Sequence, residues 1–256
     1  MEIILLLVGF LASVFGSICG LGGGVIIKPV LDSFAFASAD TVSFLSGITV
    51  LCMSAYNIIK TIISKDNLNL KTNLPLGFGA AIGGILGKEL FNIIKHSSSN
   101  PSFVGNVQAI SLGVFTFLTL IYTINSHKIE KRNVESKIMC IFLGLVLGLM
   151  SSFMGIGGGP FNLLVLSYFF SMSTKKAATS SLFIILLSQI FSLLTTIITH
   201  TIPEYKISWL LVMSISGILG GIVGKYFNKK LNEHTIHNLY LIFLILIILI
   251  SIYNSF

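Results

Sequence analysis

The sequence has few charged residues for its length. Of 256 residues only 10% are charged, 54% are hydrophobic, and the mean hydropathy is +0.94. Soluble domains carry roughly a quarter charged residues. A water-soluble globular protein is therefore excluded, and the environment of most of this chain is the lipid bilayer.

The sequence also lacks the marks of several functional classes. Its longest polar stretch, residues 125–137, is much shorter than an independent domain, which leaves no room for a soluble ATPase, kinase or nucleic-acid-binding module. The three cysteines, Cys19, Cys52 and Cys140, have no CxxC spacing, and all five histidines fall at the ends of apolar segments. We therefore expect no disulfide framework, no metal site and no cofactor.

Ten apolar segments make up most of the chain. Their approximate bounds are 3–19, 25–36, 41–59, 73–87, 102–124, 138–154, 160–172, 177–199, 207–223 and 236–253. Most approach the roughly 20 residues that span a bilayer. The second and seventh have only 12 and 13 residues and each follows a glycine cluster, so we expect half-helices after a break. The predicted fold class is an all-α polytopic membrane protein, with eight full spans, or ten segments if the half-helices are counted.

The two glycine clusters belong to an internal repeat. At an offset of 135 residues, GSICGLGGGVIIKPVL (16–31) aligns with SSFMGIGGGPFNLLVL (151–166), so that the GGG triplets coincide. At an offset of 137, GGILGKEL (83–90) aligns with GGIVGKYF (220–227). These echoes predict an internal duplication within one membrane domain, with a first transmembrane repeat over 1–130 and a second over 131–256.

The positions of Lys and Arg indicate how the chain crosses the membrane. If each glycine cluster only bends one long span, the two faces share the basic residues almost equally. If the chain reverses at each cluster, one face collects twelve of the sixteen: Lys60, Lys65, Lys71, Lys128, Lys131, Arg132, Lys137, Lys175, Lys176, Lys225, Lys229 and Lys230. The other face then has Lys88, Lys95 and Lys206, and Lys28 alone lies inside a segment.

This asymmetry favours the reversal and places the twelve basic residues in the cytoplasm. It predicts a multi-pass protein of the cell membrane with both termini external. Five segments per half also make the two repeats inverted, with a glycine-turn hairpin and three spanning helices in each, a common plan of secondary transporters. Whether the two short segments cross fully or re-enter partway stays open.

The glycine triplets themselves are the first candidates for a binding site. Irregular backbone within a bilayer is tolerated only where protein or a water-filled cavity satisfies it. The turns therefore offer free N–H groups and the positive end of a helix dipole, which suit an anion. The alternative is close helix packing, which we assign instead to the helically spaced glycines. These are Gly79, Gly83, Gly87, Gly217, Gly221 and Gly224.

Polar residues near the turns extend the candidate site. Lys28 is a candidate counter-charge for an anion, or it reaches a membrane interface instead. Ser17 and Ser152 precede the two turns and Asn162 follows the second. The alternative for the serines is a bond to the carbonyl four residues back in their own helix.

The helix after the second half-helix supplies further candidates. Thr179 and Ser180 either line the path or cap that helix. Gln189 is either a link between helices or part of the path. The complete predicted substrate-binding set is Ser17, Gly20, Gly22, Gly23, Gly24, Lys28, Ser152, Gly155, Gly157, Gly158, Gly159, Asn162, Thr179 and Ser180.

The doubled motif, GxGGGxxxxPxL from Gly20 to Leu31 and SxxGIGGGP from Ser152 to Pro160, resembles the TauE/SafE sulfite exporter family of membrane permeases. The resemblance implies a transporter of small anions such as sulfite, thiosulfate, sulfonates or organic carboxylates. It also implies protons as a coupling ion. The sequence departs from a symmetric site, because Pro29 aligns with Leu164 and Lys28 with Leu163.

The leading functional hypothesis is therefore a secondary transporter of small anions, working by alternating access at a central site formed by the two glycine turns. The alternative is a membrane scaffold or assembly factor that transports nothing. An intramembrane enzyme is not expected, since no Ser or Cys in the spans has a His or Asp partner at interior depth. The expected partners are a small anion and the bilayer, with no nucleic acid.

Overall fold

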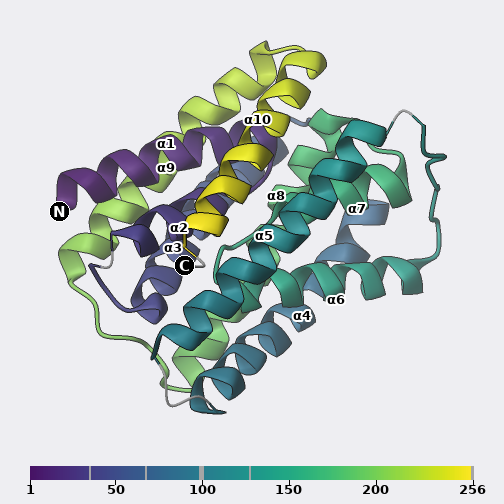
Figure 1. Ribbon diagram of the computed structural model, residues 1–256. Coiled ribbons are helices and arrows are strands. Elements are labelled where there is room, and N and C mark those ends of the chain that lie inside the picture. Colours follow the sequence, from purple (N-terminus) through teal and green to yellow (C-terminus); the bar gives the residue numbers. More distant parts are fainter. Residues whose placement is uncertain (35, 67, 98–100, 127, 255–256) are drawn as a thin grey trace.

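We analysed a computed structural model, which describes residues 1–34, 36–66, 68–97, 101–126 and 128–254 (Figure 1). The described chain is helical. Its ten helices are α1 (Glu2–Cys19), α2 (Gly24–Ser33), α3 (Ala39–Ile63), α4 (Leu70–Ser97), α5 (Pro101–Asn125), α6 (Lys137–Phe153), α7 (Pro160–Phe170), α8 (Thr174–Ile198), α9 (Ile207–Lys230) and α10 (Glu233–Tyr253). The prediction of an all-α polytopic membrane protein is confirmed.

Local sequence signals explain several helix ends. The Ser38 and Asn232 side chains accept hydrogen bonds from the N–H groups of Thr41 and Thr235, which starts α3 and α10. Pro160 occupies the first position of α7, where its missing N–H costs nothing. Gly20 ends α1 in the left-handed conformation. Each of these residues is of the type that its position favours.

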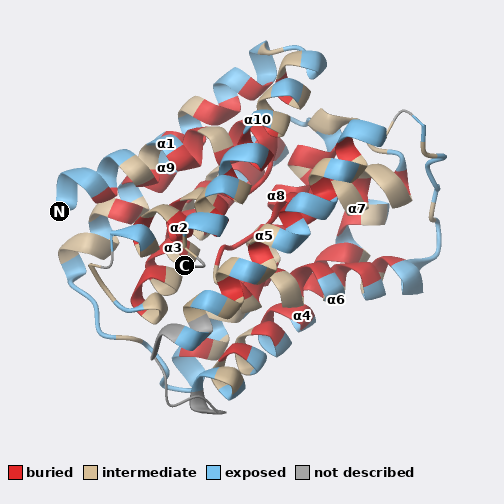
Figure 2. Cartoon of the chain, in the orientation of Figure 1, coloured by how far each residue is buried: buried red, intermediate tan, exposed pale blue. Residues whose placement is uncertain are grey.

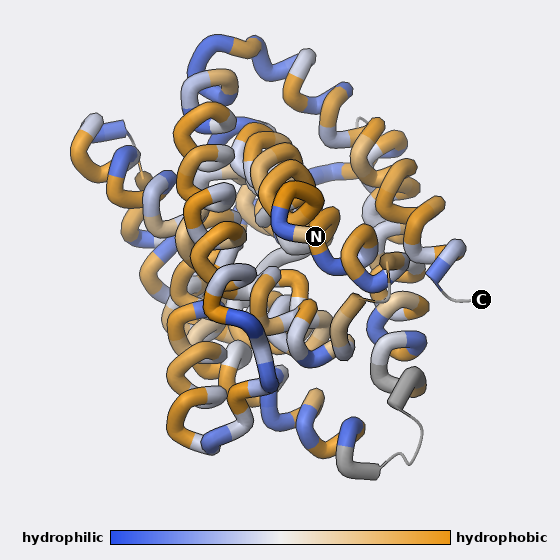
Figure 3. Tube along the Cα trace, turned by 90° about the vertical axis from the view of Figure 1, so that its left-hand side faces the viewer, coloured by the Kyte–Doolittle hydropathy of each residue, from blue (hydrophilic) through white to orange (hydrophobic). Residues whose placement is uncertain are grey.

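Within the described residues, seven helices are long and apolar enough to span a membrane, namely α1, α3, α4, α5, α8, α9 and α10. α6 has 17 residues, and α2 and α7 have 10 and 11. Large apolar side chains cover the outer faces of the spans, for example Phe78, Ile138 and Leu249. Exposed and buried positions alternate around most helices (Figure 2), and long hydrophobic stretches run along them (Figure 3). An exposed surface of apolar side chains is suited to contact with lipid.

The helices extend beyond the predicted apolar segments, and this corrects the placement of ten lysines that were assigned to loops. α4 continues to Ser97 and α9 to Lys230, so Lys88, Lys95 and Lys225 lie within helices rather than in loops. Lys28 is therefore not the single basic residue inside a segment. Three of the predicted segments ended just before Lys60, Lys88 and Lys225, whereas a long lysine stem can lie along a helix while its ammonium reaches a polar group.

The chain reverses direction at both glycine clusters. The carbonyl groups of Tyr168 and Phe169, at the end of α7, accept hydrogen bonds from the N–H groups of Arg132 and Val134, which precede α6. α7 therefore returns to the face at which α6 begins. In the first half, Leu31 near the end of α2 joins a buried cluster with Leu5 near the start of α1. Both pairs are helical hairpins.

The connecting segments gather at two opposite faces. At one face Lys229, at the end of α9, pairs with Asp66 after α3, at 2.8 Å. At the other, Lys95 near the end of α4 pairs with Asp40 at the start of α3. The Thr41 hydroxyl of the same segment donates to the Glu204 carbonyl before α9. This grouping is the one that reversal at the glycine clusters predicts.

The two halves of the chain are interlocked. α1 packs along α9, and α6 packs along α4, so each half contributes a long helix to the other (Figure 1). Small residues make these contacts close. A side chain at Gly144 would meet the Leu76 carbonyl of α4, and one at Gly9 would meet the Ser216 side chain of α9. The helically spaced glycines, Gly79 and Gly83 among them, lie against backbone of the facing helix, which confirms their packing role.

Candidate functional site

The two glycine turns match in backbone conformation at two aligned glycine pairs and differ at a third, where Gly158 has φ of 156° and the aligned Gly23 has φ of −56°. Gly20 and Gly155, which align at an offset of 135, have φ of 72° and 64°. The aligned pair Gly22 and Gly157 have φ of 72° and 66°. These left-handed conformations strain any residue with a Cβ. Glycine is thus required at the same two places in each turn, which explains the repeated GxG spacing.

The turns touch each other in the middle of the molecule. A Cβ on Gly24 would collide with the Ile156 carbonyl of the second turn. A Cβ on Gly158 would lie 3.0 Å from the Leu21 carbonyl oxygen of the first. The glycines at these positions therefore let two stretches of irregular backbone meet directly. The structure brings together both halves of the predicted glycine site.

Each turn is covered by a long helix of the other half. Gly20 lies against Ala178 of α8, and Gly155 lies against Ser43 of α3. Positions 43 and 178 are themselves 135 residues apart. A second pair repeats the pattern, because Val50 of α3 faces Gly157 of the second turn and Ile185 of α8 faces the aligned Gly22 of the first. The contacts around the two turns are therefore related by the same offset as the sequence repeat.

The turns expose backbone donors that the described protein atoms do not satisfy. The N–H groups of the two triplets, Gly22 to Gly24 and Gly157 to Gly159, have no hydrogen-bond acceptor within the described parts of the chain. All six glycines are buried. Buried N–H groups are rarely left unpaired, because each costs about 1–3 kcal/mol. Their arrangement calls for water or an anion at the turns.

Side chains with unused hydrogen-bonding atoms surround the same place. The Ser46 hydroxyl of α3 is fully buried, lies beside Gly24 and has no partner among the described atoms. Asn162 of α7 is also fully buried; its Nδ2 donates to the Ser181 hydroxyl at 3.1 Å, while its Oδ1 lacks a donor. Asn162 was in the predicted set, but Ser46 was not, although it is the repeat equivalent of Ser181.

The structure separates the other predicted polar residues. The Ser17 hydroxyl donates to Asn57 Oδ1 at 2.8 Å, on the side of the turns that faces α9. The Thr179 hydroxyl bonds only to the Lys175 carbonyl of its own helix, at 3.3 Å. Ser180 lines a recess at the lysine-rich face rather than the turns. These three residues do not share one cavity.

Lys28 also points away from the turns. Its ammonium lies 2.6 Å from an Asp32 carboxylate oxygen one helical turn further along α2, and its side chain is buried. It lines a small pocket with Gln108 of α5 and Asn254 beyond α10. Its predicted role as a counter-charge for the anion stays a prediction, and the ion pair leaves less of its charge available.

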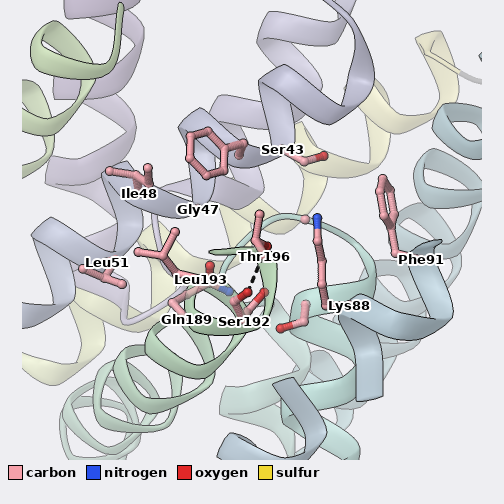
Figure 4. A pocket seen from close by; sticks show the side chains of 13 residues that line it. Ser43, Gly47, Ile48, Leu51, Lys88, Phe91, Gln189, Ser192, Leu193 and Thr196 are labelled. Carbon is pink, nitrogen blue, oxygen red and sulfur yellow. Dashed lines mark hydrogen bonds between the residues drawn. The ribbon is translucent and has the colours of Figure 1, made fainter. Parts of the chain in front are cut away.

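A cavity of about 40 Å³ opens beside the second turn, between α3, α4, α6 and α8 (Figure 4). That is room for about three water molecules, or for an anion of a few heavy atoms. The residues that line it are Ser43, Phe44, Gly47, Ile48, Leu51, Lys88, Phe91, Ser152, Gly155, Gln189, Ser192, Leu193 and Thr196. It therefore joins two predicted residues, Ser152 and Gly155, to a lysine.

Lys88 supplies the positive charge of this cavity. Its Nζ lies 4.9 Å from the centre of the Phe91 ring and, within the described residues, has no hydrogen-bond acceptor and no salt bridge. The carboxylates of Asp40 and Glu89 act on its charge only from beyond salt-bridge distance. Figure 4 shows the side chain extending between Phe91 and the α8 residues Ser192 and Thr196. Gln189 is 7% exposed and likewise unpartnered among the described residues. The cavity thus holds a cation and an amide with unused donors.

Sequence reasoning missed Lys88 because it placed the residue in a loop. Two signals were present. The apolar stretch LFNII continues after Lys88, and the repeat at offset 137 superposes Lys88 on Lys225. Gln189 was identified, but its role was left between helix packing and the path. It lines the cavity.

Comparison with known proteins gives a consistent result. The family model for the sulfite exporter TauE/SafE family matches residues 5–253. The probable membrane transporter protein MJ0441 of Methanocaldococcus jannaschii is 26% identical over 245 residues, covering 90% of this chain and 87% of that protein. The probable membrane transporter protein YunE of Bacillus subtilis is 25% identical over 256 residues, covering 91% of each. No solved structure matches significantly. The chain belongs to the sulfite exporter TauE/SafE family of membrane transporters.

Proposed function

We propose that this protein carries a small anion, such as sulfite, thiosulfate, a sulfonate or a small carboxylate, through the place where the two glycine turns meet. The observation that carries the proposal is the set of six buried glycine N–H groups, Gly22 to Gly24 and Gly157 to Gly159, without acceptors among the described atoms. An anion accepts hydrogen bonds and donates none, so it complements such a set.

The surrounding charge supports an anion over a cation. α2 and α7 both begin at the turns, so the positive ends of two helix dipoles lie there. The cavity beside the second turn holds Lys88, and none of the described residues that line it is Asp or Glu. Ser46 and Asn162 add polar atoms that can adapt to different substrates. This site would distinguish anions mainly by size and hydrogen bonding.

The paired contacts of the two halves support alternating access. Residues 1–130 and 131–256 would form two inverted repeats in one membrane domain, each holding the turn of the other with a long helix. Rocking of one repeat against the other would then open the turns to each face in succession. The lysine-rich loops would lie in the cytoplasm and both termini outside the cell membrane.

The proposal is tested by uptake into proteoliposomes. Radiolabelled sulfite, thiosulfate, taurine and acetate are offered separately, with and without a pH gradient. We expect saturable uptake of at least one of these anions; stimulation by the gradient would indicate coupling to protons. If the folded protein takes up none of the four anions, the proposal is wrong, and a role as a non-transporting membrane scaffold is favoured instead.

A serine pair locates the path. Ser46→Ala removes the unpartnered hydroxyl at the turns. The control, Ser13→Ala, removes an equally buried and unpartnered hydroxyl that lies against Gly220 of α9. We expect only the first substitution to lower uptake, by about tenfold if one hydrogen bond worth about 1.4 kcal/mol is lost. Equal effects of the two substitutions would place the path elsewhere.

A further inference from the structure

The cavity at Lys88 has a repeat-related counterpart in the other half of the molecule. Four of its polar residues are Ser152 of α6, Ser192 and Thr196 of α8, and Lys88 of α4. At the offsets of the sequence repeat, 135 for α6 and α8 and 137 for α4, these positions correspond to Ser17, Asn57, Thr61 and Lys225. We call the two sets the Lys88 cluster and the Lys225 cluster.

The Lys225 cluster is also assembled in space, although no prediction grouped its members. Lys225 Nζ donates to the Thr61 hydroxyl at 2.7 Å. The Thr61 hydroxyl in turn donates to the Asn57 carbonyl at 2.8 Å, and the Ser17 hydroxyl donates to Asn57 Oδ1 at 2.8 Å. Three helices, α1, α3 and α9, are linked by these bonds. The four residues of this cluster therefore meet as their equivalents do in the Lys88 cluster.

The two clusters differ in whether they are closed. In the Lys225 cluster the exposed fractions of Ser17, Asn57 and Thr61 are at most 1%, and that of Lys225 is 7%. In the Lys88 cluster the Thr196 hydroxyl donates to the Ser192 carbonyl at 3.0 Å, as Thr61 does to the Asn57 carbonyl. Lys88, however, has no hydrogen bond to Thr196 or to Ser192. Lys88 and Ser192 are half-buried and face the cavity. One cluster is sealed and the other is open.

The clusters also lie toward opposite faces. The cavity includes Ser43 and Phe44, near the start of α3, and Thr196, near the end of α8. Lys225 contacts Thr61 near the end of α3, one turn before the Lys229–Asp66 pair. An anion that enters at one face would therefore meet Lys88, and one that leaves at the other would meet Lys225.

We propose that Lys88 and Lys225 are equivalent anion-binding residues that serve the two faces in turn. In the present structure Lys88 is available to a small oxyanion, whereas Lys225 is held by Thr61. In the opposite state Lys88 would bond to Thr196 and Lys225 would be released. This inference rests on the proposed function. It adds that each lysine changes between an anion and a threonine hydroxyl as its partner.

Sided transport kinetics test this proposal. Uptake of radiolabelled sulfite is measured in right-side-out and in everted membrane vesicles from cells that express the protein. Lys88→Met should raise the KM at least tenfold for sulfite that enters from the cavity face. Lys225→Met should do so for entry from the opposite face. Lys88→Arg and Lys225→Arg, which keep the charge, should recover part of the affinity.

Two exposed lysines provide matched controls. Lys206 and Lys230 each lie over an aromatic ring, as Lys88 does, but at the ends of α9. Lys206→Met and Lys230→Met should leave both KM values unchanged. Gel filtration checks that each variant is folded. Thiol labelling of Ser192→Cys measures whether the cavity is open to solvent, independently of transport.

The outcomes separate this inference from the proposed function. If the wild-type protein takes up sulfite and neither Lys88→Met nor Lys225→Met changes a KM, the lysines are not binding residues. If each substitution raises the KM equally from both faces, the sided exchange is wrong. If the wild-type protein takes up none of the four anions in proteoliposomes, the proposed function falls and this inference with it.

Discussion

The two glycine turns are alike at two aligned glycine pairs and in the helices that cover them, whereas the polar clusters beside them are not alike. The turns share their positive φ angles at aligned glycines and are covered by aligned helices. The Lys225 cluster, in contrast, is hydrogen-bonded and buried, while the Lys88 cluster borders a cavity. The common part is suited to a fixed central site, and the differing parts are suited to gates. Substitutions at the turns and in the two clusters distinguish a central binding site from gates.

The largest effect is expected where the two turns touch. Gly24→Leu places a side chain against the Ile156 carbonyl, so the turns must separate. We expect a loss of about 3 kcal/mol in stability, and uptake reduced about 100-fold. Uptake in proteoliposomes and thermal unfolding in detergent measure the two effects. Gly105→Ala, at a glycine whose Cβ would lie 4.0 Å from its nearest neighbour, is the control and should be neutral.

An exchange of residues between the clusters tests why one is sealed. The Asn57 side chain accepts a hydrogen bond from Ser17, whereas no such bond joins the equivalent Ser192 and Ser152 in the described part of the chain. Serine has a shorter side chain than asparagine and lacks its amide. Ser192→Asn should let the Lys88 cluster close, and uptake from the cavity face should fall about tenfold, as expected for about 1.4 kcal/mol in favour of the closed state. Asn57→Ser should ease opening at the opposite face. Unchanged sided uptake in both variants would show that this residue does not set the difference.

The half-helices are anchored unequally, and this predicts a moderate difference in stability. The buried Tyr240 hydroxyl donates to the Pro160 carbonyl at the start of α7, at 2.8 Å. Asn254 donates to the Pro29 carbonyl of α2 at 2.7 Å, but it is only partly buried. Tyr240→Phe should cost about 1 kcal/mol because it removes a buried hydrogen bond between α10 and α7, and Asn254→Ala about half as much. Thermal unfolding in detergent compares them.

The smallest effect is expected at Lys28. Because Asp32 already neutralises much of its charge, Lys28→Met should change the KM for sulfite by less than about twofold, an energy of about 0.4 kcal/mol. The paired variant Lys28→Met with Asp32→Asn should behave like the wild type. A large effect of Lys28→Met alone in the same uptake assay would restore it as a counter-charge.

Much of the fold could be predicted from the sequence because hydropathy and charge are patterned along the chain itself. The apolar runs predicted ten helical segments, and the distribution of Lys and Arg favoured chain reversal at Gly20 to Gly24 and at Gly155 to Gly159. The helix ends were less certain, because an apolar run ends at a lysine while the helix continues. Lys88 was misplaced for that reason.

The candidate site was only partly predictable, since it depends on packing between distant segments. The glycines and Asn162 could be chosen because they adjoin the turns in sequence. Ser46 and Lys88 come from other helices, and nothing local indicates that α3 brings Ser46 to Gly24 or that α4 brings Lys88 to the cavity beside the second turn. Thr179 and Ser180 were chosen for their polarity near a helix start, and their side chains lie away from the turns.

The most direct test of the account is thiol accessibility at the two equivalent positions. In a background without Cys19, Cys52 and Cys140, Ser192→Cys and Asn57→Cys are labelled with a membrane-impermeant thiol reagent applied from each face. We predict that the position 192 thiol reacts from the cavity face while the position 57 thiol is protected. Conditions that shift the transporter to its opposite state should protect the position 192 thiol and expose the position 57 thiol to the other face. A position 57 thiol that stays protected during active sulfite uptake would contradict the account.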